Sequence, residues 1–368
     1  MLTYFLVPAL ALLPTWLSRA AKNGDPHEEG QQIDRWRYTY VLSVVVLAVY
    51  AGARVNVGTD YSLYESLFLT FDPNYVGYFL EESPQEPGFT LGILGLRLFS
   101  EDPRTLFMVS SFLTVGCAAV GMRRLSVNFA VSLTLFVLLG FYLAPFNILR
   151  QGLAVSLNFL AYSYLGKRRW VFVLLNVLAI SVHSSAIIAV LLQLGLRRTK
   201  PSWRLFGLML LVTAVFAVYF ATLAGSLGFL EFINERYVVY LQGQESGIGT
   251  YLYLVSRALL VVLLVIYRPK NGKIDRYITL SMVGVCLLLL GTQAEAISRL
   301  ELYFGIYLVV ALPYIVREIP RRARLLVWAA VLMGSLTFYV AYLTQFGDLL
   351  PYQFDWSLIG LSERTSAP

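Results

Sequence analysis

Two ionisable residues at the ends of apolar segments offer the clearest chemistry in this chain. Arg150 stands at the head of the apolar run after Asn147, and His183 interrupts a second apolar run. A titratable side chain inside hydrocarbon costs free energy, so its presence favours a functional role. A guanidinium binds phosphate oxygens through two N–H groups, and an imidazole exchanges a proton near neutral pH. Together they predict a site that binds an anionic group and transfers a proton.

Further arginines beside apolar helices could extend that site. Arg299 lies between two apolar segments, Arg257 falls two turns into another, and Arg236 belongs to the polar segment NERYVVYL. If these side chains converge with Arg150, they would bind a pyrophosphate group. Alternatively, each arginine reaches the lipid headgroups or pairs with a neighbouring acid. The candidate acids are Glu235, Glu295 and Glu301.

Two carboxylates in the polar segment 54–104 are candidates for proton transfer or substrate binding. Asp60 precedes the apolar stretch Tyr61–Phe71, and Glu86 precedes a proline. A carboxylate whose pKa is raised by partial burial could deprotonate a hydroxyl group. The alternative is local, since Asp60 could cap a helix and Glu86 could shape a turn. The sequence leaves His183 and Asp60 as alternative general bases.

The composition identifies the environment of these residues. Hydrophobic residues make up 58% of the chain and charged residues 14%, whereas soluble proteins carry about 25% charged residues. Apolar runs of roughly 20 residues recur along the whole chain, which predicts a polytopic all-α membrane protein. We expect about ten to twelve transmembrane helices, joined by short re-entrant or interfacial helices, in a single membrane domain over residues 1–368.

The distribution of Lys and Arg predicts the topology. Residues 54–104 are rich in Asp and Glu, and basic clusters alternate with apolar runs along the rest of the chain. The positive-inside rule therefore makes 54–104 and 224–249 extracytoplasmic loops and places both termini outside. Within the first loop, Gly88–Phe99 is too short to span ~30 Å at ~1.5 Å per residue, so we expect an interfacial helix after Pro87. The other predicted helices cover residues 2–18, 39–53, 105–122, 127–143, 148–166, 204–223, 250–267, 277–293, 300–316 and 325–345.

The segment 170–196 holds His183 between two basic clusters. Its length is large for one crossing and small for two. Because both clusters are predicted to be cytoplasmic, we expect two short helices in a hairpin with His183 at its apex, below the outer surface. The rival topology is a single crossing that leaves one cluster outside.

Several motif classes are absent from the sequence. A G-x-x-x-x-G-K-[ST] loop is missing, which argues against a nucleotide-driven pump. The chain has no D-x-D, CxxC or HExxH, and Cys117 and Cys286 fall inside apolar runs. We therefore expect no metal and no other cofactor. The net charge of +7 is explained by cytoplasmic loops without nucleic-acid binding.

Short motifs in order along the chain resemble the EpsG family of Wzy-like polysaccharide polymerases. The motifs are VGTDYSLY (57–64), QEPGF (85–89), NILRQGLAVSL (147–157), SVHSSAI (181–187), ERYVVY (235–240) and SRLELYF (298–304). The resemblance implies a membrane glycosyltransferase of the GT-C type in the bacterial plasma membrane, with its active site on the extracytoplasmic side. It implies that polyprenyl-pyrophosphate-linked oligosaccharides are joined there, beside a flippase and a chain-length regulator of the same pathway.

The resemblance and the residues together give a set of predicted roles. His183 or Asp60 would accept a proton, and Arg150, Arg299, Arg236 and Arg257 would bind pyrophosphate. The predicted substrate contacts are Glu86, Tyr61, Tyr64, Gln151 and Tyr237. Two other functions stay open: a flippase that grips the same lipid-linked sugar, and a membrane acyltransferase that modifies a polysaccharide.

Overall fold

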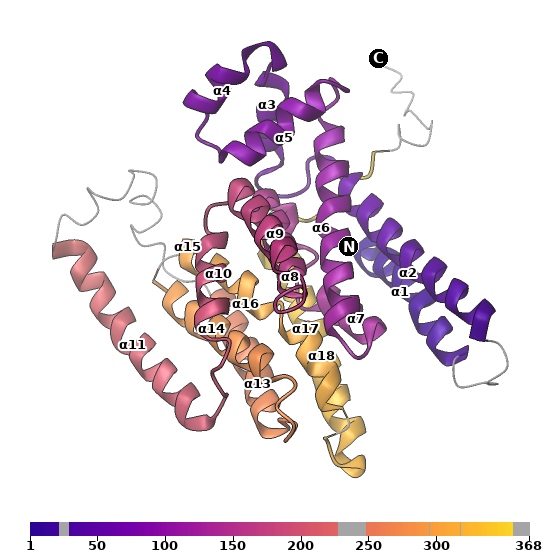
Figure 1. The fold of residues 1–368 in the computed structure, drawn as a ribbon, viewed down its shortest axis with the longest axis vertical. Helices are drawn as coiled ribbons and strands as arrows, with labels where there is room; N and C mark the ends of the chain where they lie inside the picture. Colours follow the sequence, from indigo (N-terminus) through magenta and orange to yellow (C-terminus); the bar gives the residue numbers. More distant parts are fainter. Residues whose placement is uncertain (22–28, 227–247, 294, 317, 356–368) are drawn as a thin grey trace. The chain divides into compact units, whose positions relative to one another are not determined.

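The computed structural model describes residues 1–21, 29–226, 248–293, 295–316 and 318–355, and the regular elements in these ranges are helices (Figure 1). The chain forms two compact units. The first comprises Met1–Arg124, Tyr142–Ser184 and Leu343–Pro368, and the second comprises Leu125–Phe141 and Ser185–Tyr342. The all-α class predicted from the apolar runs is confirmed.

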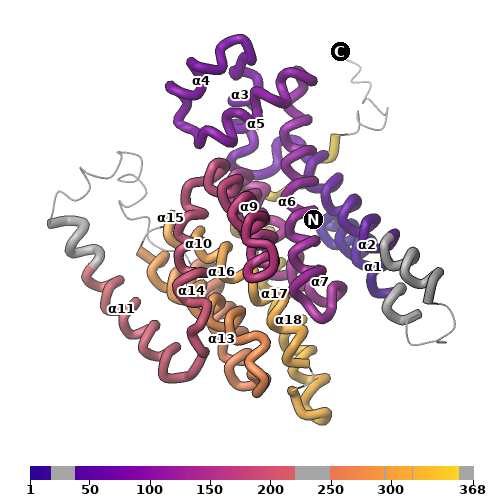
Figure 2. The backbone as a smooth tube through the Cα atoms, viewed as in Figure 1, coloured from indigo at the N-terminus to yellow at the C-terminus, as the bar shows by residue number. Residues whose placement is uncertain are grey.

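The first unit combines long helices with a group of short ones. Its elements are α1 (Leu2–Ala21), α2 (Glu29–Gly52), α3 (Tyr61–Thr70), η2 (Pro73–Tyr75), α4 (Val76–Glu82), α5 (Pro87–Arg97), α6 (Arg104–Leu125), η3 (Ala144–Phe146), α8 (Leu149–Tyr162) and α9 (Arg169–Val182). The long helices α1 and α2 run side by side (Figure 2). The short helices α3, α4 and α5 gather near the start of α6 (Figure 1).

The second unit contains α7 (Phe129–Leu138), α10 (Ala186–Gly195), α11 (Trp203–Ser226), α13 (Ile248–Ile266), α14 (Asp275–Gly291), α15 (Glu295–Ser298), η5 (Arg299–Glu301), α16 (Leu302–Gly305), α17 (Leu308–Ile315) and most of α18 (Arg321–Gln345). Helix α14 packs on α11, on α13 and on the short helices around Glu301. The segment that bears Arg299 is therefore held against a buried helix.

In the described part of the chain, three helices are long and apolar enough to cross a membrane: α6, residues Gly249–Ile266 of α13, and α18. The pair Ala296–Gly305 and Leu308–Ile315, bent by 41°, adds a fourth if it forms one broken span. Shorter apolar helices include Leu2–Leu17, Tyr38–Gly52, Arg169–Val182 and Trp203–Tyr219. The chain is thus a polytopic membrane protein, and the expected ten to twelve crossings stay a prediction.

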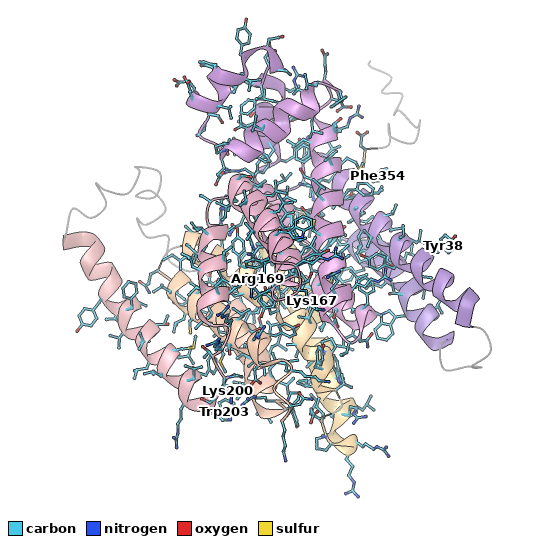
Figure 3. The ribbon with its side chains drawn as sticks, in the orientation of Figure 1. Tyr38, Lys167, Arg169, Lys200, Trp203 and Phe354 are labelled. Carbon is cyan, nitrogen blue, oxygen red and sulfur yellow. The ribbon has the colours of Figure 1, made fainter. Side chains whose placement is uncertain are left out.

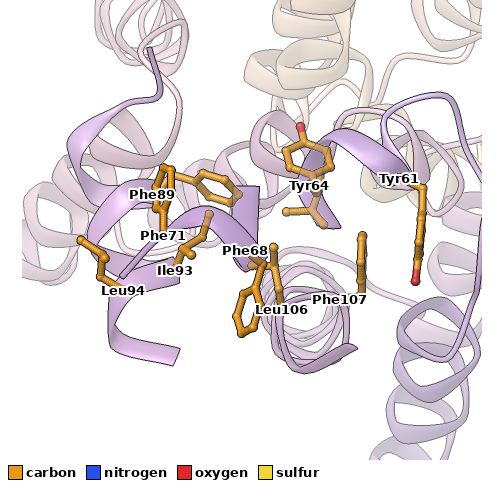
Figure 4. Packing of buried hydrophobic residues seen from close by; sticks show 10 residues of the cluster. Tyr61, Tyr64, Phe68, Phe71, Phe89, Ile93, Leu94, Leu106 and Phe107 are labelled. Atoms are coloured by element: carbon orange, nitrogen blue, oxygen red, sulfur yellow. The ribbon is translucent and has the colours of Figure 1, made fainter. Parts of the chain in front are cut away.

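Aromatic and aliphatic side chains hold the short helices α3, α4 and α5 of the first unit together. The buried cluster contains Tyr61, Tyr64, Phe68, Phe71, Phe89, Ile93, Leu94, Leu106, Phe107 and Leu149. The rings of Tyr61 and Phe107 stack with centroids 4.2 Å apart, which joins α3 to α6 (Figure 4). Stacked aromatic pairs add stability beyond the burial of their area. This cluster gives the polar segment 54–104 a fixed structure.

Helices α8 and α9 form a hairpin inside the first unit, with Lys167 and Arg169 at its turn (Figure 3). Asn158 on α8 donates a hydrogen bond to Asn176 on α9 at 2.7 Å, and both side chains are buried. A paired amide satisfies polar groups that would be costly to bury alone. The hairpin therefore has a fixed register, with the start of α8 and the end of α9 at the same end.

Several predicted helices are shorter in the structure than the apolar runs suggested. The predicted helix 127–143 ends at Leu138, because Gly140 takes a left-handed backbone conformation with φ +81° that terminates helices. The predicted helix 148–166 ends at Tyr162, ahead of Gly166 with φ +87°. The predicted helix 300–316 is divided into η5, α16 and α17. Hydrophobicity alone did not reveal these breaks.

Candidate active site

One carboxylate joins the Arg150 and His183 side chains in the first unit. Glu86 forms an ion pair with Arg150 Nη1 through Oε2, and its Oε1 lies 3.0 Å from His183 Nδ1. The backbone N–H of Ser184 donates to the same Oε1 at 3.0 Å, and the Ser184 hydroxyl lies 3.2 Å away. Residues that are 64 and 98 positions from Glu86 in sequence thus meet at one carboxylate.

Three helix ends place these side chains. Glu86 is extended immediately before Pro87 starts α5, Arg150 lies in the first turn of α8, and His183 is the extended residue after α9. The segment around Glu86 packs closely on the end of α9, because a Cβ at Gly88 would lie 2.3 Å from Ser181 Oγ. The helix ends therefore fix the cluster, and no long flexible loop contributes to it.

The electrostatics of the cluster keep Glu86 ionised. Burial alone would raise the pKa of the Glu86 carboxyl, but His183, the Ser184 N–H and the Arg150 charge together lower it to about 2. The side chains of Glu86, Arg150 and His183 remain 16%, 22% and 24% exposed. The cluster thus pairs an ionised carboxylate with a cation and an imidazole, and all three side chains remain partly exposed.

Unsatisfied polar atoms gather around this carboxylate. The buried Arg150 Nε and Gln85 Oε1 make no hydrogen bond in the structure. His183 Nδ1, although 3.0 Å from Glu86 Oε1, is poorly aligned for a hydrogen bond. Buried polar atoms are normally paired, so each unpaired one calls for an explanation. The part of the Arg150 side chain that a ligand could reach is the 22% that remains exposed.

Helix α3 brings Tyr64 and Asp60 to the same region. Burial raises the pKa of the Tyr64 phenol, while the Arg150 charge lowers it and the Asp60 charge raises it. Tyr64 therefore lies close enough to Arg150 and Asp60 for both charges to change the pKa of its phenol. Asp60 occupies the N-cap position of α3, but its side chain makes no capping hydrogen bond. The interpretation of Asp60 as a helix cap that acts through its carboxylate is therefore wrong. Its interpretation as a proton acceptor stays a prediction.

The other predicted substrate contacts of the first unit are buried. Tyr61 is 3% exposed and stacks on Phe107, and burial raises the pKa of its phenol to about 12. Gln151 is 5% exposed on α8, next to Arg150. In this arrangement Tyr61 supports α3 from within the aromatic cluster.

The second unit holds a separate buried ion pair. Arg257 Nε lies 3.1 Å from Glu301 Oε1, and both side chains are 1% exposed. Arg257 also donates to the Leu139 carbonyl at 2.6 Å, and Tyr253 donates to Glu301 Oε2 at 2.5 Å. A Cβ at Gly305 would lie 1.7 Å from Glu301 Oε1, so only glycine leaves room for the pair. Arg257 therefore ties α13 to the end of α7 and to the broken helix.

The pairing of Arg257 with Glu301 matches the alternative in which an arginine binds a nearby acid. Its guanidinium also lies over the rings of Phe141 and Phe338, at 4.7 and 5.1 Å. Arg299 precedes Glu301 by two residues and interacts electrostatically with Tyr342. Arg236 and Tyr237 lie outside the described residues.

A family model described as the EpsG family matches residues 37–354. The chain belongs to the EpsG family. No curated protein and no solved structure matches it. The match spans both helical units and covers the segments that carry Glu86, Arg150 and His183. Membership supports a role in building polysaccharides for this membrane protein.

The sequence singled out Glu86, Arg150 and His183, but it did not show that they share one carboxylate. Glu86 was interpreted as a turn residue or a substrate contact, and it is the common partner of Arg150 and His183. Gln85 and Asn147 were quoted only as parts of motifs. Their roles depend on contacts between distant segments, such as the 3.0 Å hydrogen bond from the Thr59 N–H to Asn147 Oδ1. A buried acid paired with Arg257 was foreseeable, but its position within the helix break was not.

Proposed function

We propose that this EpsG-family protein polymerises oligosaccharide repeat units carried on polyprenyl pyrophosphate, at the outer face of the bacterial plasma membrane. The observation that carries the proposal is the shared carboxylate, which places an arginine and a histidine together at one partly exposed site. The family match supports the polysaccharide product. Arg150 and His183 support glycosyl transfer from a pyrophosphate leaving group as the reaction.

The reaction is a transfer of a glycosyl group. The hydroxyl oxygen of one lipid-linked saccharide attacks the anomeric carbon of the other, and the bond from that carbon to pyrophosphate breaks. The leaving polyprenyl pyrophosphate gains negative charge as the bond lengthens. Arg150, whose side chain is 22% exposed, stabilises that charge, because a preorganised donor outside bulk water acts most strongly where charge develops.

His183 accepts the proton of the attacking hydroxyl. Its Nδ1 faces the ionised Glu86 carboxylate at 3.0 Å, which favours a proton on Nδ1 and leaves Nε2 as the acceptor. Once Nε2 is protonated, the same carboxylate stabilises the imidazolium, and the proton then passes to water. Glu86 keeps its charge throughout because its pKa is about 2. Asp60, which lies near enough to influence Tyr64, is the alternative acceptor.

The decisive experiment uses the purified full-length protein and a repeat unit linked to a short-chain polyprenyl pyrophosphate. We expect a ladder of products that differ by one repeat unit. Arg150→Lys keeps the charge but loses the planar fork, so it should reduce ladder formation by about tenfold or more. The matched control is Arg97→Lys, since Arg97 binds the Phe71 carbonyl at 3.0 Å, away from Glu86.

A protein that makes no ladder but moves the lipid-linked sugar across liposomes is a flippase, and the proposal then fails. If Arg150→Lys makes ladders as well as the parent and the Arg97→Lys control, Arg150 is an interfacial residue and the pyrophosphate binds elsewhere.

A further inference from the structure

The loop before Asp60, the helix that bears Arg150 and the C-terminal segment meet at one amide. Asn147 lies three residues before Arg150, and its Oδ1 accepts the N–H of Thr59 at 3.0 Å. A Cβ at Gly58 would lie 2.3 Å from the Phe146 carbonyl oxygen. The backbone that leads into Asp60 is therefore seated directly on the start of α8.

The C-terminal segment closes the other side of this amide. A Cβ at Gly347 would lie 1.7 Å from Asn147 Nδ2, so only glycine fits there, and its φ of +71° also favours glycine. The next residue, Asp348, accepts the Gly58 N–H through its carbonyl at 3.1 Å. Residues 58–59, 147 and 347–348 thus form a three-way joint within the first unit.

Further contacts anchor the segment 347–355 on the same unit. The Val55 N–H donates to the Gln353 carbonyl at 3.0 Å, and the Asp355 N–H donates to the Ala53 carbonyl at 3.0 Å. The Asp355 carboxylate pairs with Arg104 Nη1 at 2.7 Å. The residues that follow the last long helix are therefore built into the structure that carries Asp60.

We propose that Asn147 is a positioning residue of the transfer site, and that the C-terminal segment 347–355 is a clasp that completes it. The joint sets the backbone of Asp60 against the start of the helix that carries Arg150 in its first turn, and these two charges lie close to the same Tyr64 phenol. A displacement of about 1 Å between reacting groups can reduce a rate by about 100-fold. The proposal rests on the proposed function and adds two parts to its site.

The test compares Asn147→Leu with Asn147→Asp in the ladder assay. Leucine has the same branched shape and number of heavy atoms but no acceptor for the Thr59 N–H, whereas aspartate keeps an oxygen in place. We expect Asn147→Leu to lower kcat about 100-fold with little change in KM for the lipid-linked substrate, because Arg150 is unchanged. Asn147→Asp should stay within about tenfold of the parent. A purely structural role would lower the unfolding midpoint of Asn147→Leu and not its kcat alone.

Gly347→Ala tests the clasp and should lower kcat like Asn147→Leu. Its matched control is Gly92→Ala, because a Cβ at Gly92 meets no atom within 4 Å. Each variant is first checked for an unchanged elution profile and unfolding midpoint in detergent. Parental kcat in folded Asn147→Leu and Gly347→Ala would overturn the proposal, and a rise in KM alone would make Asn147 a substrate ligand instead.

A readout without activity separates this proposal from the proposed function. Asp60→Cys reports on the joint by its rate of reaction with a thiol reagent, since Asp60 is only half-buried. Adding Asn147→Leu or Gly347→Ala should accelerate labelling several-fold, and adding Gly92→Ala should not. If the parent makes no ladder but labelling accelerates as expected, the joint exists and the proposed reaction is wrong. Unchanged labelling in both variants would refute the joint itself.

Discussion

Among single side chains, Glu86 belongs to the proposed transfer site, and its lowered pKa also contributes to the stability of the folded state. Its folded-state pKa of about 2 lies below the ordinary value of 4.5. A lowered carboxyl pKa contributes stability above the unfolded pKa, and that contribution is lost as the pH falls through the folded pKa. Arg150 and His183 face this carboxylate. The cluster should therefore lose its internal stabilisation only in strongly acidic solution.

Glu86→Gln should lower the unfolding midpoint in detergent at pH 7, because Arg150 then lacks its counter-charge. The difference from the parent should narrow between about pH 4.5 and pH 2, where Glu86 itself becomes protonated. Thermal unfolding at several pH values measures both effects. Glu65→Gln is a suitable control on the same outer region. A difference that stays constant with pH would mean that the Glu86 charge does not stabilise the folded state.

Single substitutions also decide whether His183 or Asp60 is the general base. His183→Ala should reduce the rate of ladder formation by roughly two to four orders of magnitude, the usual scale for loss of a general base. Substrate binding should persist because Arg150 remains. Asp60→Asn should cause a smaller loss and retain the acidic limb of the pH–rate profile. The roles are reversed if Asp60→Asn is inactive while His183→Ala works at nearly the parental rate.

At the level of helices, the break at His183 was predictable because a polar residue and two serines interrupt an apolar run between basic clusters. Helix α9 ends at Val182 and α10 begins at Ala186, as expected. The predicted helix after Pro87 is also present as α5. The division of the segment around Glu301 was not predictable from hydrophobicity, and Glu301 there pairs with Arg257, which is 44 residues away. Contacts of that kind leave no local pattern in a sequence.

The orientation of α9 and α10 in the membrane stays a prediction that labelling can test. Helix α9 has 14 residues, or about 21 Å at ~1.5 Å per residue, which is short for a ~30 Å core. Cysteines at Arg168 and Arg198 should both resist an impermeant thiol reagent added outside spheroplasts. Ser62→Cys, on the exposed face of α3, should react. Labelling of either basic position from outside would show that residues 170–196 cross only once.

For the whole molecule, the positions of the basic side chains indicate how the first unit is oriented in the membrane. Arg124 at the end of α6 donates to Ser163 at 2.9 Å and lies 4.0 Å over the Tyr164 ring, next to the basic turn of the α8–α9 hairpin. Arg150 and His183 lie at the opposite end of that hairpin. In the second unit, Arg268 binds the Pro201 carbonyl at 3.1 Å, so two basic clusters meet there as well. The positive-inside rule favours a cytoplasmic location for these basic ends.

An outer location for the Glu86 site leads to a test with intact cells. A repeat unit on a short-chain polyprenyl pyrophosphate, added to spheroplasts, should be polymerised in the external medium without transport, because both substrates would reach the open end of the α8–α9 hairpin directly. Spheroplasts that carry Arg150→Ala provide the background, and inside-out vesicles provide the opposite face. Ladder formation that requires inside-out vesicles would place Arg150 and His183 on the cytoplasmic side, and the basic clusters would then lie outside, against the positive-inside rule.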